Sequence, residues 1–465
     1  MTHSNGTVFL AAMWPGATSW VDWLHPNAQK FWTGEVQSFF DEKNGVDVDG
    51  IWIDMNDPAN FCPYPCSDPV AWSAANGDPP APPPVRTSWP SLPGFPPDFQ
   101  PPNTSEAQMS KRQTPGNQTG VSGRNLMNPP YAINNTDGPL YANALWPDLV
   151  QHGGYAFYDL HNLFASGMIT ATHSALLTRR PNIPTVGADV CGFNLNTTET
   201  LCARWAVLGA WYPFYRNHAD ITANQQEFYL WPLVTVAAQN AIKTRMQLMD
   251  YFYTQIHYQT VDGLPRTILP LFYIYPSDAN TLENELQFFY GPSLLVSPVT
   301  EENSTSVTYY LPNDIFYDFF SGEQVSGNGD YVMQDNVNYT EIPVHIRGGS
   351  IIPMRVDGAN NTKLLRELDF ELLIAPDASG KATGILYLDD GESLAPKETS
   401  EITFSYNAGN SALIMEGTFG YQTSSKIQRA IVLGTKRESS AKGQQKGQIV
   451  TLDKPLSTGF SAVLR

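Results

Sequence analysis

The spacing of apolar and polar residues divides the chain into two regions of different character. Up to about residue 275, short apolar runs alternate with segments in which apolar residues recur every three or four positions. The short runs predict buried strands, and the longer period predicts amphipathic helices. The predicted strands are residues 7–13, 46–53, 183–188, 211–216 and 267–275, and the predicted helices are residues 27–40, 158–178, 201–208 and 231–258. Strands that alternate with helices in this way are typical of a parallel α/β barrel.

The second region begins near residue 284, where short alternating strands with Gly and Asn turns replace the helical pattern. The predicted strands are residues 306–311, 315–320, 342–346, 370–374, 383–388, 402–406 and 430–432. Short strands without intervening helices predict an all-β region, which we interpret as two sandwiches. The Asp-Asp-Gly sequence at residues 389–391 predicts a hairpin turn within it.

Within the first region, residues 67–153 change character, because two clusters of proline within them exclude regular structure. Prolines crowd residues 79–84 and 93–102, and each removes a backbone donor and fixes φ. The stretch is either a linker between domains or a long excursion from one rim of the barrel.

Composition and charge limit the classes of partner. The chain has 465 residues, of which 45 are acidic and 27 basic, and its formal charge is −18. No Lys/Arg cluster is dense enough to follow a phosphate backbone, so we expect no nucleic-acid partner. No apolar run approaches the roughly 18 residues of a membrane span, so we expect no membrane insertion. Nothing in the sequence indicates an oligomeric state.

Sequons and cysteines indicate a secretory, extracellular product, although residues 1–6 lack the basic and apolar segments of a signal peptide. Asn-x-Ser/Thr sequons occur at Asn5, Asn103, Asn117, Asn134, Asn196, Asn303, Asn338 and Asn360. The four cysteines pair by spacing, Cys62 with Cys66 and Cys191 with Cys202. Four reduced thiols in a cytosolic protein are the alternative. Zinc is not suggested, because no Cys/His quartet surrounds either pair.

The candidate site begins where the apolar run at residues 46–53 ends in two carboxylates, Asp54 and Asp57. A parallel barrel strand delivers such groups to the carboxyl-terminal rim of the barrel. Solvated carboxylates that cap a strand end are the alternative. The neighbouring Trp52 and Met55, with Phe61 further on, favour a sugar-binding pocket.

Three blocks of the chain are distinctive, and they occur at residues 52–56 (Trp-Ile-Asp-Met-Asn), 187–193 (Gly-Ala-Asp-Val-Cys-Gly-Phe) and 212–218 (Tyr-Pro-Phe-Tyr-Arg-Asn-His). In this order they resemble blocks of glycoside hydrolase family thirty-one, the α-glucosidases and their relatives. Shorter matches occur at residues 14–16, 161–163, 345–350 and 388–392. Together the matches cover nearly the whole chain, and they are most similar to the fungal extracellular α-glucosidases.

The resemblance implies a fold and a division into domains. The fold would be a truncated (β/α)8 TIM-type barrel followed by two C-terminal all-β sandwich domains. Residues 1–280 would form the incomplete barrel, with the proline-rich stretch as an insertion at about residues 67–153. Residues 281–355 would form a proximal sandwich and residues 356–465 a distal one.

The resemblance also implies a reaction, the retaining hydrolysis of terminal α-linked glucose from maltose-like oligosaccharides, without a metal or an organic cofactor. A retaining glycosidase needs two carboxyl groups about 5–5.5 Å apart, one to attack the anomeric carbon and one to protonate the leaving oxygen. Asp54 matches the nucleophile of the family. Asp57 stands where the family usually carries Glu, and it would be a supporting carboxylate.

Further residues that match the family would bind the sugar: Trp14, Trp52, Met55, Asp189, Phe193, Phe214, Arg216 and His218. The indoles of Trp14 and Trp52 can stack on a pyranose face, although ordinary packing is the alternative for Trp14, Met55 and Phe193. Cys191 and Cys202 resemble a family disulfide that ties down the loop after Asp189. The matching His161 is expected to be structural.

One family segment has no counterpart in the sequence. In the family, a strand and loop with a His-Trp-x-Gly-Asp sequence and an upstream substrate-binding Arg precede the Asp189 strand, and they carry the acid/base Asp. Here residues 180–182 run directly into residues 183–186, and no Trp-x-Gly-Asp occurs elsewhere. We therefore expect hydrolysis to be impaired. The alternatives are a non-catalytic carbohydrate-binding relative and an incomplete gene model.

Overall fold

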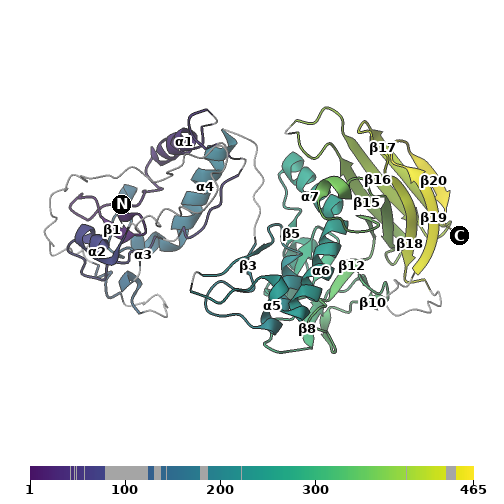
Figure 1. The fold of residues 1–465 in the computed structure, drawn as a ribbon, viewed down its shortest axis with the longest axis horizontal. Coiled ribbons are helices and arrows are strands. Elements are labelled where there is room, and N and C mark those ends of the chain that lie inside the picture. Colours follow the sequence, from purple (N-terminus) through teal and green to yellow (C-terminus); the bar gives the residue numbers. More distant parts are fainter. Residues whose placement is uncertain are drawn as a thin grey trace, which may run out of the picture. The chain divides into compact units, whose positions relative to one another are not determined.

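A computed structural model describes most of the chain as two compact units, Met1–Asn182 and Ile183–Arg465 (Figure 1). The described residues are 1–41, 43–46, 48, 50–56, 58–78, 124–129, 138–142, 144–178, 187–220, 222–393, 395–435 and 447–464. Both proline-rich clusters of the predicted insertion lie outside these ranges, as do residues 183–186 of one predicted strand. Within the described ranges, no helix combines the length and the apolar character that crossing a bilayer requires.

The first unit contains a short hairpin and several helices. The hairpin strands are β1 (Ala11–Met13) and β2 (Gly16–Thr18), the helices are α1 (Ala28–Phe39), α2 (Pro69–Asn76), α3 (Phe157–Leu160) and α4 (Phe164–Leu177), and 3-10 turns occupy Leu140–Ala142, His152–Gly154 and His161–Leu163. Helix α1 confirms the prediction at residues 27–40. It packs on α4 through Val36, which meets Ala175 and Leu176. The predicted helix at residues 158–178 is interrupted by the turn at His161, whose Nδ1 lies 2.9 Å from the carbonyl of Tyr158.

The strand predicted at residues 46–53 is wrong for the residues that the structure describes. Residues 46, 48 and 50–56 have no strand hydrogen bonding. A strand exists only beside a partner that completes its backbone hydrogen bonds, and β1 and β2, the named strands of this unit's described part, pair only with each other. An apolar run alone therefore did not suffice to form a strand here.

The second unit consists of helices followed by two all-β regions. Its helices are α5 (Glu199–Gly209), α6 (Pro232–Gln247), α7 (Met249–Asp262), α8 (Leu271–Ile274) and α9 (Thr362–Leu365), and the parallel pair is β3 (Asp189–Val190) with β4 (Arg216–Asn217). A six-stranded sheet has the order β10-β9-β12-β7-β6-β5, beside the pair β11-β8, and an eight-stranded sheet has the order β19-β18-β14-β13-β15-β16-β17-β20. The two predicted all-β regions are thus present.

The strands of these sheets have the following bounds: β5 (Ile268–Leu269), β6 (Phe288–Tyr290), β7 (Leu294–Val296), β8 (Val307–Leu311), β9 (Ile315–Asp318), β10 (Gln324–Ser326), β11 (Asp330–Gln334), β12 (Val344–Arg347), β13 (Ser350–Arg355), β14 (Phe370–Ala375), β15 (Lys381–Leu388), β16 (Ser400–Asn407), β17 (Ala412–Phe419), β18 (Lys426–Leu433), β19 (Gly447–Pro455) and β20 (Phe460–Val463). The predicted turn at residues 389–391 lies between β15 and β16, which pair antiparallel as a hairpin requires. The domain boundaries at 280 and 355 stay predictions. Strand β13, immediately before the second boundary, belongs to the eight-stranded sheet.

Strands β13 and β14 are buried on both faces, and alternate residues feed different cores. Ile352 and Leu373 belong to the cluster that includes Val190 and the helices α5 and α6. Ile351 and Leu372 belong to the cluster that the eight-stranded sheet encloses with β16 and β17. The period of two in a strand explains this division.

Two long predicted elements are divided in the structure. The helix predicted at residues 231–258 bends at Leu248, so that α6 packs on α5 while α7 packs on β13 and β15 of the eight-stranded sheet. The barrel strand predicted at residues 267–275 is instead the short β5, which pairs antiparallel with β6, followed by α8. The strand predicted at residues 211–216 is reduced to its end, β4.

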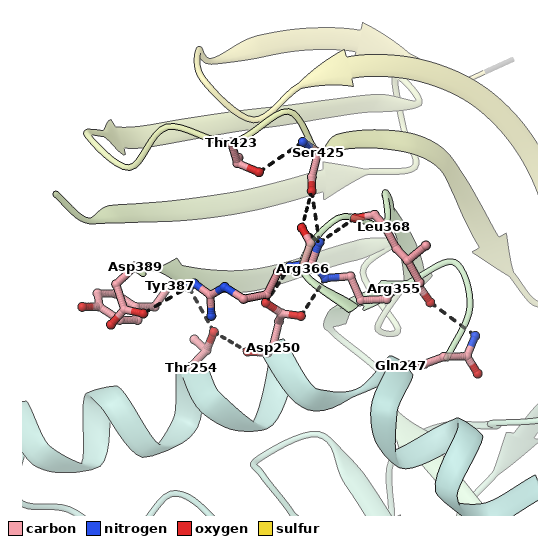
Figure 2. Close-up of polar contacts among 10 residues, drawn as sticks. All are labelled: Gln247, Asp250, Thr254, Arg355, Arg366, Leu368, Tyr387, Asp389, Thr423 and Ser425. Carbon is pink, nitrogen blue, oxygen red and sulfur yellow. Dashed lines mark hydrogen bonds and ion pairs between the residues drawn. The ribbon is translucent and has the colours of Figure 1, made fainter. Parts of the chain in front are cut away.

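A buried ion pair fastens α7 to the eight-stranded sheet (Figure 2). Arg355 donates from Nε to Oδ2 of Asp250 at 2.8 Å and from Nη2 to Oδ1 at 2.9 Å, and both side chains are less than a tenth exposed. Arg355 also donates to the carbonyl of Leu368 and lies 3.8 Å above the ring of Phe370. One turn further along α7, Thr254 accepts from the backbone of Tyr387 in β15. The last long helix and the distal sheet are therefore one packed body.

Candidate functional site

Asp54 lies in a strand-free segment of the first unit, and its side chain is exposed. Its Oδ1 accepts a hydrogen bond from the backbone N–H of Met55 at 2.8 Å. Met55 has a φ of 50°, in the left-handed region that residues with a side chain seldom adopt. Because such strain gathers at functional sites, the sharp turn directly after Asp54 is consistent with a site at this carboxylate.

A buried amide anchors the chain just beyond this turn. Asn60 is fully buried, and its Oδ1 accepts from the backbone N–H of Ala12 in β1 at 3.0 Å and from that of Cys62 at 3.3 Å. Phe61 donates its own N–H to the carbonyl of Ala12 at 2.9 Å. Asn60 was not predicted as a site residue. No sequence signal identifies it, because the backbone N–H of Ala12 that it satisfies lies 48 residues earlier in the chain.

The aromatic and sulfur-containing candidates of this unit present large exposed surfaces. Trp14, in the turn between β1 and β2, is 43% exposed and meets Phe61 edge-on with 4.6 Å between ring centroids. Trp52 is 49% and Met55 54% exposed. Asp57 lies outside the described residues, so its supporting role stays a prediction. The Cys62–Cys66 disulfide predicted from spacing is formed.

In the second unit, the parallel register of β3 and β4 brings Asp189 beside Arg216. Arg216 donates from Nη2 to Oδ1 of Asp189 at 2.8 Å, and about a third of each side chain is exposed. Side chains at the same end of neighbouring parallel strands lie together at one edge of the sheet. The predicted sugar ligands Asp189 and Arg216 are thus a single ion pair at the surface.

Three more predicted residues lie near this pair. The ring of Phe193 lies 5.2 Å from that of His218 with 32° between the planes, and the backbone N–H of His218 donates to the carbonyl of Val190. The guanidinium of Arg216 lies 5.9 Å from the ring centroid of Phe214. The structure therefore brings the five predicted side chains of this unit into one cluster, which we call the Asp189 cluster: Asp189, Phe193, Phe214, Arg216 and His218.

Covalent and hydrogen-bonded anchors hold the loop that follows β3. The predicted Cys191–Cys202 disulfide is formed and joins this loop to α5. The side chain of Gln226, which is 4% exposed, reaches the same loop and the segment after β4 through its amide nitrogen. Gln226 was not predicted, because it lies in a polar loop without periodicity. No sequence signal distinguishes it from the exposed Gln225 beside it.

A surface hollow of about 490 Å³ opens beside His218. Its lining includes the polar side chains of Asn217, Asp220, Asn224 and Glu227 and the rings of His218 and Phe228. Hydroxyl-rich ligands suit such a lining, because amides and carboxylates supply both donors and acceptors. Among the described residues, no group of three or more His, Cys, Asp and Glu side chains could hold a metal ion.

Family models of glycosyl hydrolases match stretches of both units. The model of the glycosyl hydrolases family 31 TIM-barrel domain matches residues 1–183 and 181–255. The model of the glycosyl hydrolase family 31 C-terminal domain matches residues 265–352. The chain therefore belongs to glycosyl hydrolase family 31, which confirms the predicted family and the predicted fold class of a barrel followed by β domains.

The chain is also similar to fungal proteins whose names describe them as glucosidases. The chain is 46% identical over 498 residues to a probable alpha/beta-glucosidase of Aspergillus fumigatus, covering 97% of this chain and 55% of that protein. It is 47% identical over 470 residues to a probable alpha/beta-glucosidase of Arthroderma benhamiae, covering 97% and 53%. It is 33% identical over 460 residues to an alpha-glucosidase of Mucor javanicus, covering 86% and 50%. The chain spans about half the length of the curated relatives it matches.

Solved structures with the same fold are more distant in sequence. A crystal structure of glucosidase II alpha subunit matches with a TM-score of 0.60 at 23% identity, covering 94% of this chain and 45% of that one. A heterodimeric complex of ER glucosidase II matches with a TM-score of 0.62 at 21% identity, covering 100% and 51%. At these identities the likeness concerns the fold.

Proposed function

We propose that this chain carries the glucose-binding side of an α-glucosidase, with Asp54 as the nucleophile of a retaining mechanism. The observation that carries the proposal is the match of the family's barrel model to both stretches that hold site residues. One stretch includes the exposed Asp54, and the other includes the Asp189 cluster. The names of the fungal relatives support terminal α-linked glucose of maltose-like oligosaccharides as the substrate class.

The proposed roles follow from the positions of the side chains within each unit. The Asp54 carboxylate is exposed, so it can approach an anomeric carbon and form a covalent glucosyl ester. The Asp189–Arg216 ion pair offers acceptors and donors to sugar hydroxyls at one strand edge. The exposed indoles of Trp14 and Trp52 are suited to stacking on a pyranose ring. Asp57, three residues after Asp54, would be a supporting carboxylate.

We further propose that turnover is limited by a missing acid/base group. The barrel model matches in two pieces that meet at residues 181–183, and the two compact units divide after Asn182. The alignment with the Aspergillus fumigatus relative is longer than this chain, so that relative carries residues without a counterpart here. These three observations support the internal gap that the sequence predicts. General acid–base assistance is worth about 10²–10⁴-fold in rate. Without it, the sugar on the far side of the scissile bond in a natural oligosaccharide is a poor leaving group.

An activated substrate tests the proposal directly. α-Glucosyl fluoride has a leaving group that needs no protonation, so Asp54 can be glucosylated even without a general acid. Release of the sugar still needs a base, so we expect the glucosyl ester to accumulate and to be seen by intact-protein and peptide mass spectrometry. Azide, a nucleophile that needs no base, is expected to release the sugar as a glucosyl azide. Maltose is expected to be hydrolysed slowly or not at all.

The matched control is Asp54→Asn, which keeps the size of the side chain and removes the nucleophile. We expect no label on this variant. Labelling elsewhere, or labelling that Asp54→Asn leaves unchanged, would contradict the assignment of Asp54. Maltose binding without any label would favour the second candidate, a non-catalytic carbohydrate-binding relative that uses the Asp189 cluster as its ligand set.

We also propose that the protein is extracellular and glycosylated, because it resembles the fungal extracellular α-glucosidases. Five predicted sequons lie within the described residues, and all five asparagines are exposed: Asn5, Asn196, Asn303, Asn338 and Asn360. The other three, at residues 103, 117 and 134, lie outside the described ranges. A decrease in mass after treatment with an N-glycan amidase would support this, and an unchanged mass of the secreted protein would contradict it.

A further inference from the structure

The side-chain amide of Gln226 occupies the junction between the two segments of the Asp189 cluster. Its Nε2 lies 3.3 Å from the carbonyl oxygen of Val190 and 3.2 Å from that of Gly192, both in the segment that follows Asp189. It also lies 3.1 Å from Oδ1 of Asn217 and 3.0 Å from the carbonyl oxygen of His218. One nitrogen therefore donates to both segments.

The surroundings determine how this amide is oriented. All four atoms around Nε2 are oxygens, and Asn217 uses its own Nδ2 to donate to the backbone carbonyl of Gln226 at 2.8 Å. An amide oxygen in the same place would face four acceptors, so the NH2 group must point toward them. Its two protons are shared among the four oxygens.

The opposite end of the same amide is not stabilised. Oε1 of Gln226 is buried and has no hydrogen-bond partner among the described residues. A buried acceptor without a partner costs free energy, which the contacts of Nε2 must offset. What it does provide is a donor between two loops that carry predicted sugar ligands.

We propose that Gln226 is a positioning residue that holds the segment after Asp189 at a fixed separation from the segment of Arg216 and His218. Its side chain is almost fully buried, and it acts through the two segments that it joins. In this way it fixes the distance between the predicted sugar ligand on β3 and the one on β4. The consequence for sugar binding rests on the proposed function of the Asp189 cluster.

Three variants of the full chain test the proposal. Gln226→Glu keeps the shape but places a carboxylate oxygen against four acceptors, which repel it. Gln226→Met keeps the length and removes the donor. Gln225→Glu makes the same chemical change one residue earlier, where the side chain is exposed, and is the matched control.

The first measurement is amide hydrogen exchange without sugar. We expect Gln226→Glu and Gln226→Met to accelerate exchange in peptides covering residues 189–193 and 216–220, because the bond across the two segments is lost. Gln225→Glu is expected to exchange like the unmodified chain. Unchanged exchange in both Gln226 variants would overturn the proposal, whatever the sugar does.

The second measurement is maltose affinity by saturation-transfer NMR, relative to the unmodified chain at each pH. At about pH 7.5 we expect Gln226→Glu to bind about tenfold more weakly. Near about pH 5 the affinity should return toward normal, because burial among acceptors raises the pKa of the introduced carboxyl and its protonated form can donate. Gln226→Met should stay weak at both values. Asp189, Arg216, His218, Asp220 and Glu227 face the same region, and the ratio to the unmodified chain removes their contribution.

The two measurements separate the positioning role of Gln226 from the proposed sugar binding by the Asp189 cluster. A loss in Gln226→Glu that acidification does not reverse would indicate general damage and would overturn the positioning role. If the unmodified chain itself binds no maltose, the proposed sugar function fails. The exchange experiment then still decides whether Gln226 holds the two segments together.

Discussion

Arg355 is buried with its charge opposed by the carboxylate of Asp250, and the backbone carbonyls of Arg366 and Leu368 accept from its Nη1. Removing one partner of such a pair leaves an unpaired buried charge, which costs about 3–5 kcal/mol. We expect Arg355→Ala to lower the free energy of unfolding by about that amount in urea denaturation. The pair Lys243–Asp357, with 58% of each side chain exposed, is the matched control, and Lys243→Ala should cost less than about 1 kcal/mol. Similar losses in both variants would contradict this account.

Pairs of this kind were beyond prediction from the sequence. Asp250 and Arg355 are 105 residues apart, and a charged residue on a helix is ordinarily assigned to the solvent face. The same holds for Asn60 and Gln226, whose side chains satisfy backbone groups of distant segments. The site residues that were predicted came from short blocks of sequence, and the structure joins those of the second unit into one cluster.

At the scale of elements, the loop after β3 depends on its disulfide. Cys191 and Cys202 close a loop with a sequence separation of 11. A crosslink of that loop length lowers the conformational entropy of the unfolded chain and so stabilises the folded protein by about 2–3 kcal/mol. We expect Cys191→Ser with Cys202→Ser to lose about that much stability in urea and to exchange faster in the loop. The separation in Cys62–Cys66 is only 4, so its removal should cost less. A larger loss from the Cys62–Cys66 variant would refute the loop-length argument.

Elements were predictable where one pattern determines them. Helix α1 and strand β16 follow from apolar periodicity, because local spacing selects which face is buried, and β14 follows from a continuous apolar run. The run at residues 46–53 did not form a strand, because strand formation depends on a neighbour that the run itself does not specify. The bend at Leu248 was missed for a related reason, since α6 and α7 pack on different partners.

At the scale of the molecule, we expect the proposed internal gap to limit what the chain can do. We expect that inserting the corresponding strand and loop of the Aspergillus fumigatus relative between Asn182 and Ile183 will raise maltose hydrolysis at least about 10²-fold, the lower end of the contribution of general acid catalysis. Glucose release measures this. The same insertion with its acid/base Asp replaced by Asn is the control, and equal activities would show that the gain has another cause. Reading the transcript across codons 180–183 separately decides whether the gap belongs to the natural protein.

The burial of β13 and β14 on both faces, and of the second half of β18, also has a consequence for biosynthesis. Ile431 and Leu433 of β18 belong to the same core as Val190, directly behind Asp189. When residues up to about 300 have left the ribosome, every predicted sugar ligand has been made, yet that core still lacks its last strand. Because domains fold as units during synthesis, the Asp189 cluster is expected to remain unsupported until β18 emerges. A nascent chain arrested before residue 426 would display these side chains to chaperones and proteases rather than to a sugar.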